Sequence, residues 1–349
     1  MDALRQALEP AALPPGSTPV LAVIVDTEEE FDWSKPFSRS AVGVASIPAQ
    51  ASMQAVFRRH GIAPTYAIDW PVAATPVSIA FMRRLLDRGE CEIGAHLHPW
   101  VNPPHEETLS APNSYAGNLP RELERRKIDA LTRLIERNFG RHPRLYKAGR
   151  YGIGPQTPGI LAELGYEIDA SVVPHTSFRG DGGPDFRAGP DRPFWFGPGD
   201  RLLELPVSTG FAGRLSARGP ALFPWLEGRI GRTLRLPGIA ARTGLLERIP
   251  LTPEGCGLED LKRVARAMLA DGHRVLTLCY HSPSLVPGHT PYVRDEAQLR
   301  AFLATCDAFF DFFASEAGGR FATAAEILDA CRAARAAPAG TPEPARLSA

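Results

Sequence analysis

Seven short apolar runs alternate with helical patterns along this chain, and this alternation constrains its fold more than any other feature. The apolar runs, which we predict to be strands, cover residues 20–26, 64–70, 91–96, 144–148, 167–173, 202–207 and 274–280. Patterns with one apolar face, which we predict to be helices, cover residues 51–59, 77–88, 121–138, 156–164, 258–271 and 296–315. Such alternation favours an α/β fold with a mainly parallel sheet, in which functional residues gather at the C-terminal ends of the strands.

The chain of 349 residues has a length that one large barrel domain can occupy. We expect an N-terminal extension at residues 1–18 and a barrel domain at residues 19–332. Residues from about 175 to 250 are rich in Gly and Pro and predict an irregular or short-helical insertion. The last residues, 333–349, are rich in Ala, Pro and Arg and predict a disordered tail.

Two predicted strand ends, about seventy residues apart, contain side chains that can bind a metal ion. Asp26 and Glu28 end the first apolar run, and His96 and His98 end the third. Residues two apart in a strand point to the same face, so each pair can aim at one point. Two carboxylates and two imidazoles that converge at the mouth of a sheet suit a divalent cation and a hydrolytic water. The simpler interpretations are a solvated acidic loop and two surface histidines.

Other titratable residues follow the later predicted strands. His281 ends the last run, where a histidine could protonate a leaving nitrogen. Lys147 or Arg150, beside a turn, could hold the base carboxylate and lower its pKa. Asp169 could orient His281, as carboxylates orient imidazoles in other sites. The alternatives are a structural histidine, solvated loop charges and a helix or turn cap.

Three aromatic residues adjoin these motifs. Trp70, Trp100 and Tyr151 could each stack on a sugar ring. Buried packing explains each of them at least as well, because large aromatic side chains dominate protein cores. We therefore keep both predictions for these residues, substrate binding and packing.

Composition excludes some functions and indicates a compartment. The formal net charge is zero, so bulk charge predicts no binding to nucleic acid or to anionic lipid. The five cysteines are scattered and form no C-x-x-C pair, which argues against a disulfide framework. No secretion signal and no membrane-spanning run is visible, so we expect a cytoplasmic protein.

The order of these motifs resembles that of the NodB-homology polysaccharide deacetylase superfamily over nearly the whole chain. Asp26 and Glu28 match its first motif, an aspartate base followed by an acidic metal ligand. Residues 92–96 match the second motif, which ends in His96. Residues 147–151 are similar to the third motif, which is usually an Arg-x-Pro turn.

The later motifs follow in the same order. Residues 165–171 look like the fourth motif, and residues 278–281 look like the fifth. Two positions depart from the family pattern. Trp100 stands where the usual second histidine lies, so we expect His98 to replace it, and Lys147 stands where the third motif has arginine. These departures resemble an intracellular subgroup associated with cell-surface polysaccharides, the WalW-like proteins.

The resemblance implies a distorted parallel (β/α)7 barrel of the NodB, or glycoside hydrolase/deacetylase, type. It also implies a metal-dependent hydrolase that removes an N-acetyl group from an amino sugar or a polysaccharide precursor. Glu28, His96 and His98 would hold a divalent metal, with Zn²⁺ expected, while Asp26 would act as the base and His281 as the acid. The alternatives are a catalytically silent carbohydrate-binding relative, and a deformylase or esterase that uses the same site.

Overall fold

Seven parallel strands form the centre of the structure, a computed structural model that describes residues 8–337. Their order across the sheet is β11–β2–β3–β4–β5–β6–β8, and every neighbouring pair runs parallel. The strands are β2 (Val20–Thr27), β3 (Thr65–Ile68), β4 (Glu92–Leu97), β5 (Leu145–Ala148), β6 (Ile168–Asp169), β8 (Leu202–Glu204) and β11 (Val275–His281). Each of them falls on one of the seven runs predicted to be strands, although β6 is much shorter than its run.

The sheet curls into an incomplete barrel. Beyond β8 it continues through two antiparallel strands, β7 (Phe194–Phe196) and β1 (Glu9–Pro10), while β12 (Arg320–Phe321) pairs with β2. The gap between β8 and β11 is bridged at Ser208, whose backbone N–H donates to the Thr277 carbonyl at 3.2 Å. The predicted fold class, an α/β fold with a distorted parallel barrel, is confirmed.

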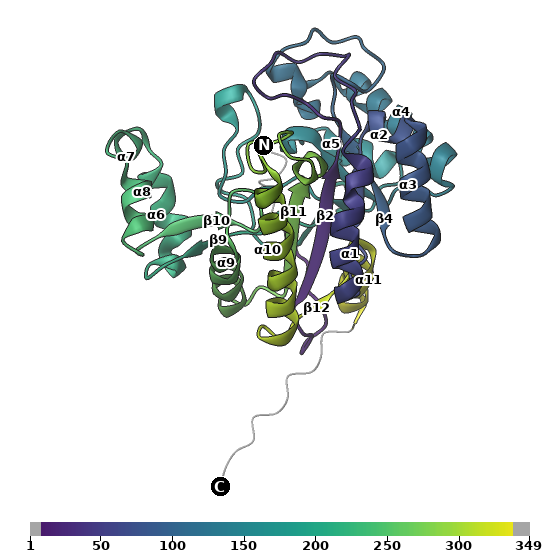
Figure 1. Cartoon of the computed structure of the whole chain (residues 1–349). Coiled ribbons are helices and arrows are strands. Elements are labelled where there is room, and N and C mark those ends of the chain that lie inside the picture. Colours follow the sequence, from purple (N-terminus) through teal and green to yellow (C-terminus); the bar gives the residue numbers. More distant parts are fainter. Residues whose placement is uncertain (1–7, 338–349) are drawn as a thin grey trace.

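Helices cover the outside of this sheet (Figure 1). They are α1 (Gln50–His60), α2 (Trp70–Ala74), α3 (Pro76–Asp87), α4 (Arg121–Phe139), α5 (Thr157–Glu163), α9 (Leu258–Ala270), α10 (Glu296–Ser315) and α11 (Ala324–Ala336). The six predicted helices are all present, with each end within one residue of its prediction. Helices α2 and α11 were not predicted: the first is a single turn, and the second begins in the barrel domain and continues into the alanine-rich stretch predicted to be a tail.

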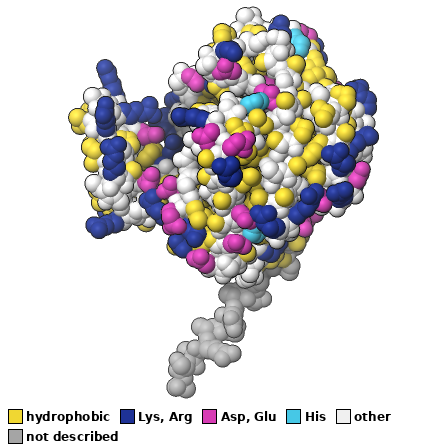
Figure 2. Space-filling view, in the orientation of Figure 1, with side chains coloured by type: hydrophobic (Ala, Val, Ile, Leu, Met, Phe, Trp, Pro, Cys, Tyr) yellow, Lys and Arg dark blue, Asp and Glu magenta, His cyan; other side chains and the backbone are white. Residues whose placement is uncertain are grey.

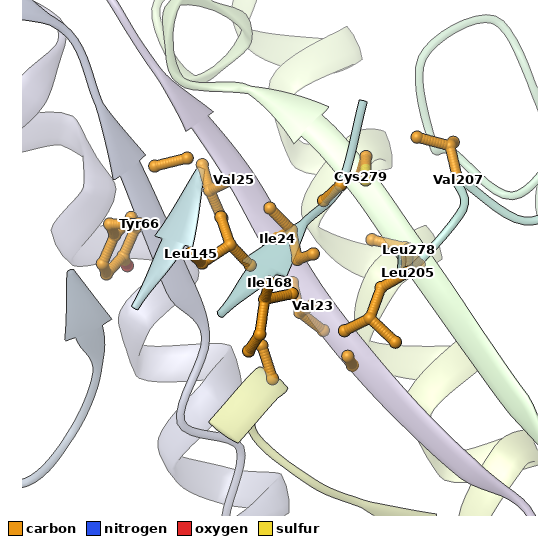
Figure 3. Close-up of a cluster of buried hydrophobic side chains, with 14 of the residues drawn as sticks. Val23, Ile24, Val25, Tyr66, Leu145, Ile168, Leu205, Val207, Leu278 and Cys279 are labelled. Atoms are coloured by element: carbon orange, nitrogen blue, oxygen red, sulfur yellow. The ribbon is translucent and has the colours of Figure 1, made fainter. Parts of the chain in front are cut away.

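The hydrophobic core surrounds β2, whose eight residues are all buried. Val23, Ile24 and Val25 pack among side chains from β3, β5, β6 and β11 (Figure 3). A strand buried on both faces is expected to be almost entirely apolar, as this one is until Asp26. Burial of each such side chain is worth about 1.5–3 kcal/mol, so the core fixes the position at which the polar residues emerge.

Strand register brings several predicted site residues to one edge of the sheet. His281 on β11 pairs with Asp26 on β2, and His96 on β4 pairs with Lys147 on β5. Because all four strands run parallel, these residues meet at the C-terminal edge, where parallel α/β folds place their chemistry.

Between β8 and α9 the chain leaves the barrel and returns. This excursion contains the antiparallel pair β9 (Thr209–Ala212) and β10 (Glu247–Pro250) and the short helices α6 (Gly219–Leu226), α7 (Arg229–Thr233) and α8 (Leu236–Arg242). At the C-terminus, α11 continues to Ala336, so the first residues of the predicted tail are helical and not disordered. Residues 338–349 of that tail and residues 1–7 of the predicted extension lie outside the described residues. Within residues 8–337, no helix is both long enough and apolar enough to cross a membrane.

Candidate metal centre and acid–base pair

Three side chains converge beyond the C-terminal ends of β2 and β4. The Oε2 atom of Glu28 lies 3.3 Å from Nε2 of His96 and 3.4 Å from Nε2 of His98. The two Nε2 atoms are 3.1 Å apart, and all three residues are buried. The residues that the sequence predicts as metal ligands therefore surround one point.

The spacing and protonation of these groups fit a small divalent cation. Tetrahedral ligands about 2.0–2.1 Å from Zn²⁺ lie about 3.3–3.4 Å from one another, close to the observed separations of 3.1–3.4 Å. Burial lowers the pKa of His96 and that of His98 to about 4, so both rings are neutral near neutral pH, as metal ligands must be. Burial also raises the pKa of Glu28 to about 7, and a bound cation would restore its ionised form.

His98 is held by Glu29, which the sequence did not mark as functional, and by Trp100, which was predicted to stack on a sugar. Its Nδ1 atom lies 2.7 Å from Oε2 of Glu29, and the Trp100 indole N–H donates to Oε1 of the same carboxylate at 2.8 Å. The backbone N–H of Glu29 in turn donates to Asp69 at 2.7 Å, and Asp69 caps helix α2. A carboxylate at the far nitrogen of a ligating histidine fixes its tautomer and orientation. Glu29 is therefore a candidate positioning residue for His98.

A tight turn after β5 presses against the other side of His98. A Cβ atom at Gly149 would lie 2.2 Å from Cδ2 of His98 and 2.5 Å from the Leu97 carbonyl oxygen, so only glycine fits there. The next two residues, Arg150 and Tyr151, have φ values of 55° and 58°. Left-handed backbone at two successive non-glycine residues is unfavourable and occurs mainly at functional sites.

Asp26 lies next to this centre and is paired with a buried cation. Its Oδ1 atom accepts a hydrogen bond of 2.5 Å from Nζ of Lys147, and both side chains are buried. Burial acts to raise the pKa of Asp26, but the positive charge of Lys147, together with that of protonated His281, outweighs it and leaves the pKa below its usual value. Of the two residues predicted to hold this carboxylate, Lys147 is the one in contact with it.

His281 faces Asp26 from β11 and is held by Glu254. Its Nε2 atom lies 3.5 Å from Oδ2 of Asp26, while its Nδ1 atom lies 2.6 Å from Oε2 of Glu254. The backbone N–H of His281 also donates to Glu254, at 3.1 Å. Burial acts to lower the pKa of His281, but Glu254, Glu28 and Asp26 raise it to about 10. About a third of the His281 side chain is exposed, so the imidazole can be reached from solvent.

Asp169 does not orient His281, contrary to the prediction from the sequence. It accepts a hydrogen bond of 2.6 Å from the Ser171 hydroxyl and lies opposite Glu204 in the pairing of β6 with β8. Burial raises the pKa of Asp169 and that of Glu204, and the two neighbouring carboxyls compete for a proton. Glu254 occupies the orienting position instead. It sits in the loop between β10 and α9, and no spacing relative to His281 could have identified it.

Arg150 also lies elsewhere. Its guanidinium contacts the Ser114 hydroxyl at 2.5 Å and Asp181 at 3.0 Å, and it sits 4.2 Å from the centre of the Tyr115 ring. It therefore does not tether Asp26. The left-handed backbone at this residue directs its long side chain toward the loop at residues 111–115.

The aromatic residues divide between packing and exposure. Trp100 is 1% exposed and stacks on His98, with ring centroids 4.3 Å apart, so it supports the ligand and cannot stack on a sugar. Trp70 begins helix α2 and packs partly against the core. Tyr151 stacks on Phe178 and lies below the Lys147 ammonium, 5.3 Å from its ring centre. For Trp70 and Tyr151, sugar binding stays a prediction.

The loop after β2 supplies an aromatic group that the sequence reasoning missed. Phe31 and Phe37 stack on each other and both lie within 5.5 Å of the Trp100 ring, measured between centroids. Trp33 contacts the same cluster and is 53% exposed. An exposed indole that adjoins the candidate centre through Trp100 is suited to contact a sugar face. The signal available in the sequence was the run Phe31-Asp-Trp33, which follows the acidic motif directly.

A separate cavity of about 700 Å³ opens beyond the turn that contains Tyr151. Tyr115, Gly152, Gly154 and Phe196 are among the residues that line it. None of the candidate metal ligands or acid–base residues lines this cavity, so it is distinct from the centre described above.

Comparison with solved structures establishes the fold class to which the chain belongs. It is similar to a Mycobacterium smegmatis protein described as a candidate polysaccharide deacetylase, with 20% identity over 97% of this chain and 99% of the other and a TM-score of 0.54. It is also similar to the allantoinase Puue, with 15% identity over 93% and 94% of the two chains and a TM-score of 0.53. A third likeness, to the 4-alpha-glucanotransferase of Thermococcus litoralis, has 13% identity over 89% of this chain and 40% of the other, with a TM-score of 0.51.

These likenesses identify a shared barrel and leave the chemistry open. The three proteins are named for three different reactions, and a fold alone does not define an activity. No family model and no curated protein matches the sequence.

Proposed function

We propose that this protein is a metal-dependent hydrolase that removes an N-acetyl group from an amino sugar or a polysaccharide precursor. The observation that supports it best is the convergence of Glu28, His96 and His98 around one point, directly beside the paired Asp26. A buried carboxylate and two neutral imidazoles form the kind of donor set that catalytic zinc sites use. The likeness to a candidate polysaccharide deacetylase and the order of the sequence motifs favour a carbohydrate amide as the substrate.

Each residue of the cluster has a role in this reaction. A divalent cation, with Zn²⁺ expected, would supply the Lewis acidity that polarises the amide carbonyl and acidifies a water molecule. Asp26 takes the proton from that water, and Lys147 holds Asp26 ionised and aimed. His281, kept protonated by Glu254, delivers a proton to the departing amine. A backbone N–H near Tyr151 would donate to the oxyanion that forms.

The raised pKa of His281 is what an acid in this position needs. A histidine with its usual pKa would be largely neutral above neutral pH and would have no proton to donate. The contact with Glu254 keeps the imidazole protonated across the neutral range. The opposite directions of the pKa shifts of Asp26 and His281 thus match a base and an acid acting on one bond.

Several finer assignments belong to this proposal. The sugar is bound in part by exposed aromatic surface, for which Trp33 is the best-placed candidate and Tyr151 and Trp70 are further ones. The chain is assigned to the NodB-homology superfamily and, within it, to the WalW-like subgroup. The cytoplasm stays the predicted compartment, and the single barrel domain at residues 19–332 stays the predicted domain organisation.

The test combines metal analysis with product analysis. Purified protein is expected to contain close to one equivalent of zinc or a similar metal, and to release acetate from N-acetylated amino sugars. Formate release from N-formyl sugars, or turnover of acetyl esters alone, would indicate the deformylase or esterase alternative. Absence of stoichiometric metal would indicate the silent carbohydrate-binding relative.

Variants assign the roles. Asp26→Asn is expected to keep the metal and to lose about 10²–10⁴-fold in turnover, because it removes the base and leaves the ligands in place. His96→Ala is expected to lose the metal. His105→Ala, which changes an exposed loop histidine, is the matched control and should retain both metal and activity. Full activity of Asp26→Asn would show that the assigned base is wrong.

A further inference from the structure

A small helical lobe projects from the side of the barrel. It comprises residues 214–246, with helices α6, α7 and α8, and it is attached through the pair β9 and β10 (Figure 1). Phe211, Phe223, Ala240 and Leu246 form its own small core, apart from the main one. The guanidinium of Arg248 lies 5.4 Å from the Phe223 ring centre and donates to the His175 carbonyl, which ties this core to the barrel.

Large apolar side chains are concentrated on the outside of this lobe. In residues 8–337, nine large hydrophobic residues are exposed, and five of them fall within these 33 positions: Trp225 (69%), Ile230 (74%), Leu234 (57%), Ile239 (49%) and Leu245 (39%). They are not members of the lobe's own core. Clustered exposure of this kind marks an interaction surface, whereas isolated exposed hydrophobic residues are ordinary.

Unpaired arginines are interspersed with these apolar side chains. The lobe contains six exposed arginines, Arg214, Arg218, Arg229, Arg232, Arg235 and Arg242, and a single acidic residue, Glu227. None of the six has a carboxylate within 4.0 Å in the described part of the chain, although most ion pairs elsewhere involve arginine. Figure 2 shows the Lys/Arg and hydrophobic side chains side by side on the projecting lobe. The lobe therefore has a formal charge of +5 within a chain whose net charge is zero.

We propose that this lobe docks on an anionic phospholipid bilayer. Hydrocarbon at the boundary between headgroups and acyl chains would cover Trp225, Ile230 and Leu234, and lipid phosphates would neutralise the arginines between them. Tryptophan is favoured at this depth because its ring is apolar and its N–H is polar. The fold explains neither the exposed apolar side chains, which lie outside the lobe's core, nor the six arginines, which form no ion pairs within residues 8–337.

A bilayer fits this surface better than two other partners. Nucleic acid would satisfy the arginines and leave five aliphatic or aromatic side chains without a role. A second copy of the chain could pair the same lobe across a two-fold axis, but this would bring two lobes of formal charge +5 against each other. Pairing with another face is not favoured either. The remaining exposed large hydrophobic residues of the described chain are instead spread over two loops and helix α3: Trp33, Val42, Val77 and Tyr292.

Vesicle binding tests the membrane-docking proposal without measuring turnover. Its result is therefore independent of whether the proposed hydrolysis is correct. The full-length protein is expected to cosediment with vesicles that contain phosphatidylglycerol. It should bind vesicles of phosphatidylcholine alone far more weakly, and added salt should weaken the binding because the attraction is partly electrostatic. Failure to bind the anionic vesicles overturns the proposal.

Substitutions in the lobe separate its two components. Arg229→Gln with Arg232→Gln should weaken binding by roughly 30-fold, at about fivefold for each arginine near an anionic surface. Trp225→Ser with Ile230→Ser should reduce binding at high salt, where the apolar contribution dominates. All four residues are exposed, so thermal unfolding should stay at the parent temperature.

Matched controls come from the barrel. Arg137→Gln with Arg141→Gln changes two exposed arginines of the α4 end, and Val77→Ser changes an exposed apolar residue of α3. Both controls should bind vesicles as the parent does. Equal losses in lobe and control variants would overturn the proposal, because they would indicate attraction by overall charge.

Two further outcomes would assign the lobe to another partner and so overturn the proposal. The first is a dimer in light scattering that the Trp225→Ser and Ile230→Ser changes abolish, without vesicle binding. The second is release of the protein from vesicles by polyanions. This release would require the lobe arginines and would be the same in the parent and in the Trp225→Ser, Ile230→Ser variant.

Discussion

The sharpest prediction concerns Gly149, whose missing side chain makes room for a candidate metal ligand. A Cβ atom at this position would lie 2.2 Å from Cδ2 of His98, whereas ordinary van der Waals contact begins at 3.4 Å. In a Gly149→Ala variant the His98 ring must therefore retreat by at least 1.2 Å. Metal sites tolerate ligand displacements of only about 0.2 Å before coordination suffers.

The ring has little freedom to retreat without losing its orientation. Trp100 stacks on it at a centroid distance of 4.3 Å, and Glu29 holds its Nδ1 atom at 2.7 Å. The added methyl would also lie 2.5 Å from the Leu97 carbonyl oxygen, which belongs to the end of β4. Neither the imidazole nor the strand can move alone, so the contacts around His98 should all shift.

We expect Gly149→Ala to weaken metal affinity by about 10–100-fold, the range found when the support of a ligating histidine is changed. Misplacement of about 1 Å near the reacting centre should also reduce kcat/KM by about 100-fold. Overpacking should lower the free energy of unfolding by about 1–3 kcal/mol. Competition with a chromophoric chelator measures the affinity, and denaturant unfolding measures the stability.

Gly159→Ala is the matched control. Gly159 lies in helix α5, and a Cβ atom there would meet nothing within 4 Å, so the change should leave metal affinity intact and slightly stabilise the helix. If Gly149→Ala bound zinc as tightly as the parent and kept its activity, His98 would not be a ligand in the geometry described.

Three other predictions follow from the acid–base pair and the metal centre. Glu254→Gln removes the charge that raises the pKa of His281, so the alkaline limb of the pH–rate profile, where the acid loses its proton, should move to lower pH while metal content stays unchanged. Lys147→Met leaves Asp26 buried without its cation, so the free energy of unfolding should fall by about 3–5 kcal/mol at neutral pH. Because the pKa of Asp26 is lowered in the folded protein, this loss should shrink as the pH drops through that pKa in urea-unfolding experiments. Chelation should lower the melting temperature, and zinc at about 100 times its Kd should restore about 2.7 kcal/mol.

The barrel could be predicted because its signals are local. Each parallel strand of this fold is buried on both faces and therefore forms a continuous apolar run, as in β2. Each long helix has an apolar face, and α4 ends where Gly140 adopts a φ of 70°. Most elements that escaped prediction lack such signals, as do the two-residue strands β1 and β12 and the one-turn helix α2. Helix α11 is the exception, because its buried face Ala324, Ile327, Leu328 and Cys331 has helical spacing.

The convergence of Glu28, His96 and His98 could also be predicted, because the parallel strand order places the C-terminal ends of β2 and β4 at one edge of the sheet. The residues that hold the two histidines, Glu254 and Glu29, could not be predicted. They reach His281 and His98 through tertiary contacts between segments far apart in the sequence. Glu254 lies in a loop 27 residues before His281, and Glu29 lies 69 residues before His98. A carboxylate in a loop gives no pattern that distinguishes an orienting role from solvation.

The placement of Trp100 is consistent with the proposal that His98 takes the place of the second histidine in the family pattern that the sequence resembles. The strand β4 ends at Leu97, and the chain then turns, with the backbone N–H of Asn102 donating to the His98 carbonyl at 3.1 Å. This turn brings Trp100, four residues after His96, back over the imidazole of His98, on which its indole stacks. In the proposed centre His98 would supply the ligand atom, while the Trp100 ring packs against its imidazole and the indole N–H donates to Glu29. On this geometry, Trp100→His should weaken the centre, because the added imidazole would lack both the area and the donor position of the indole.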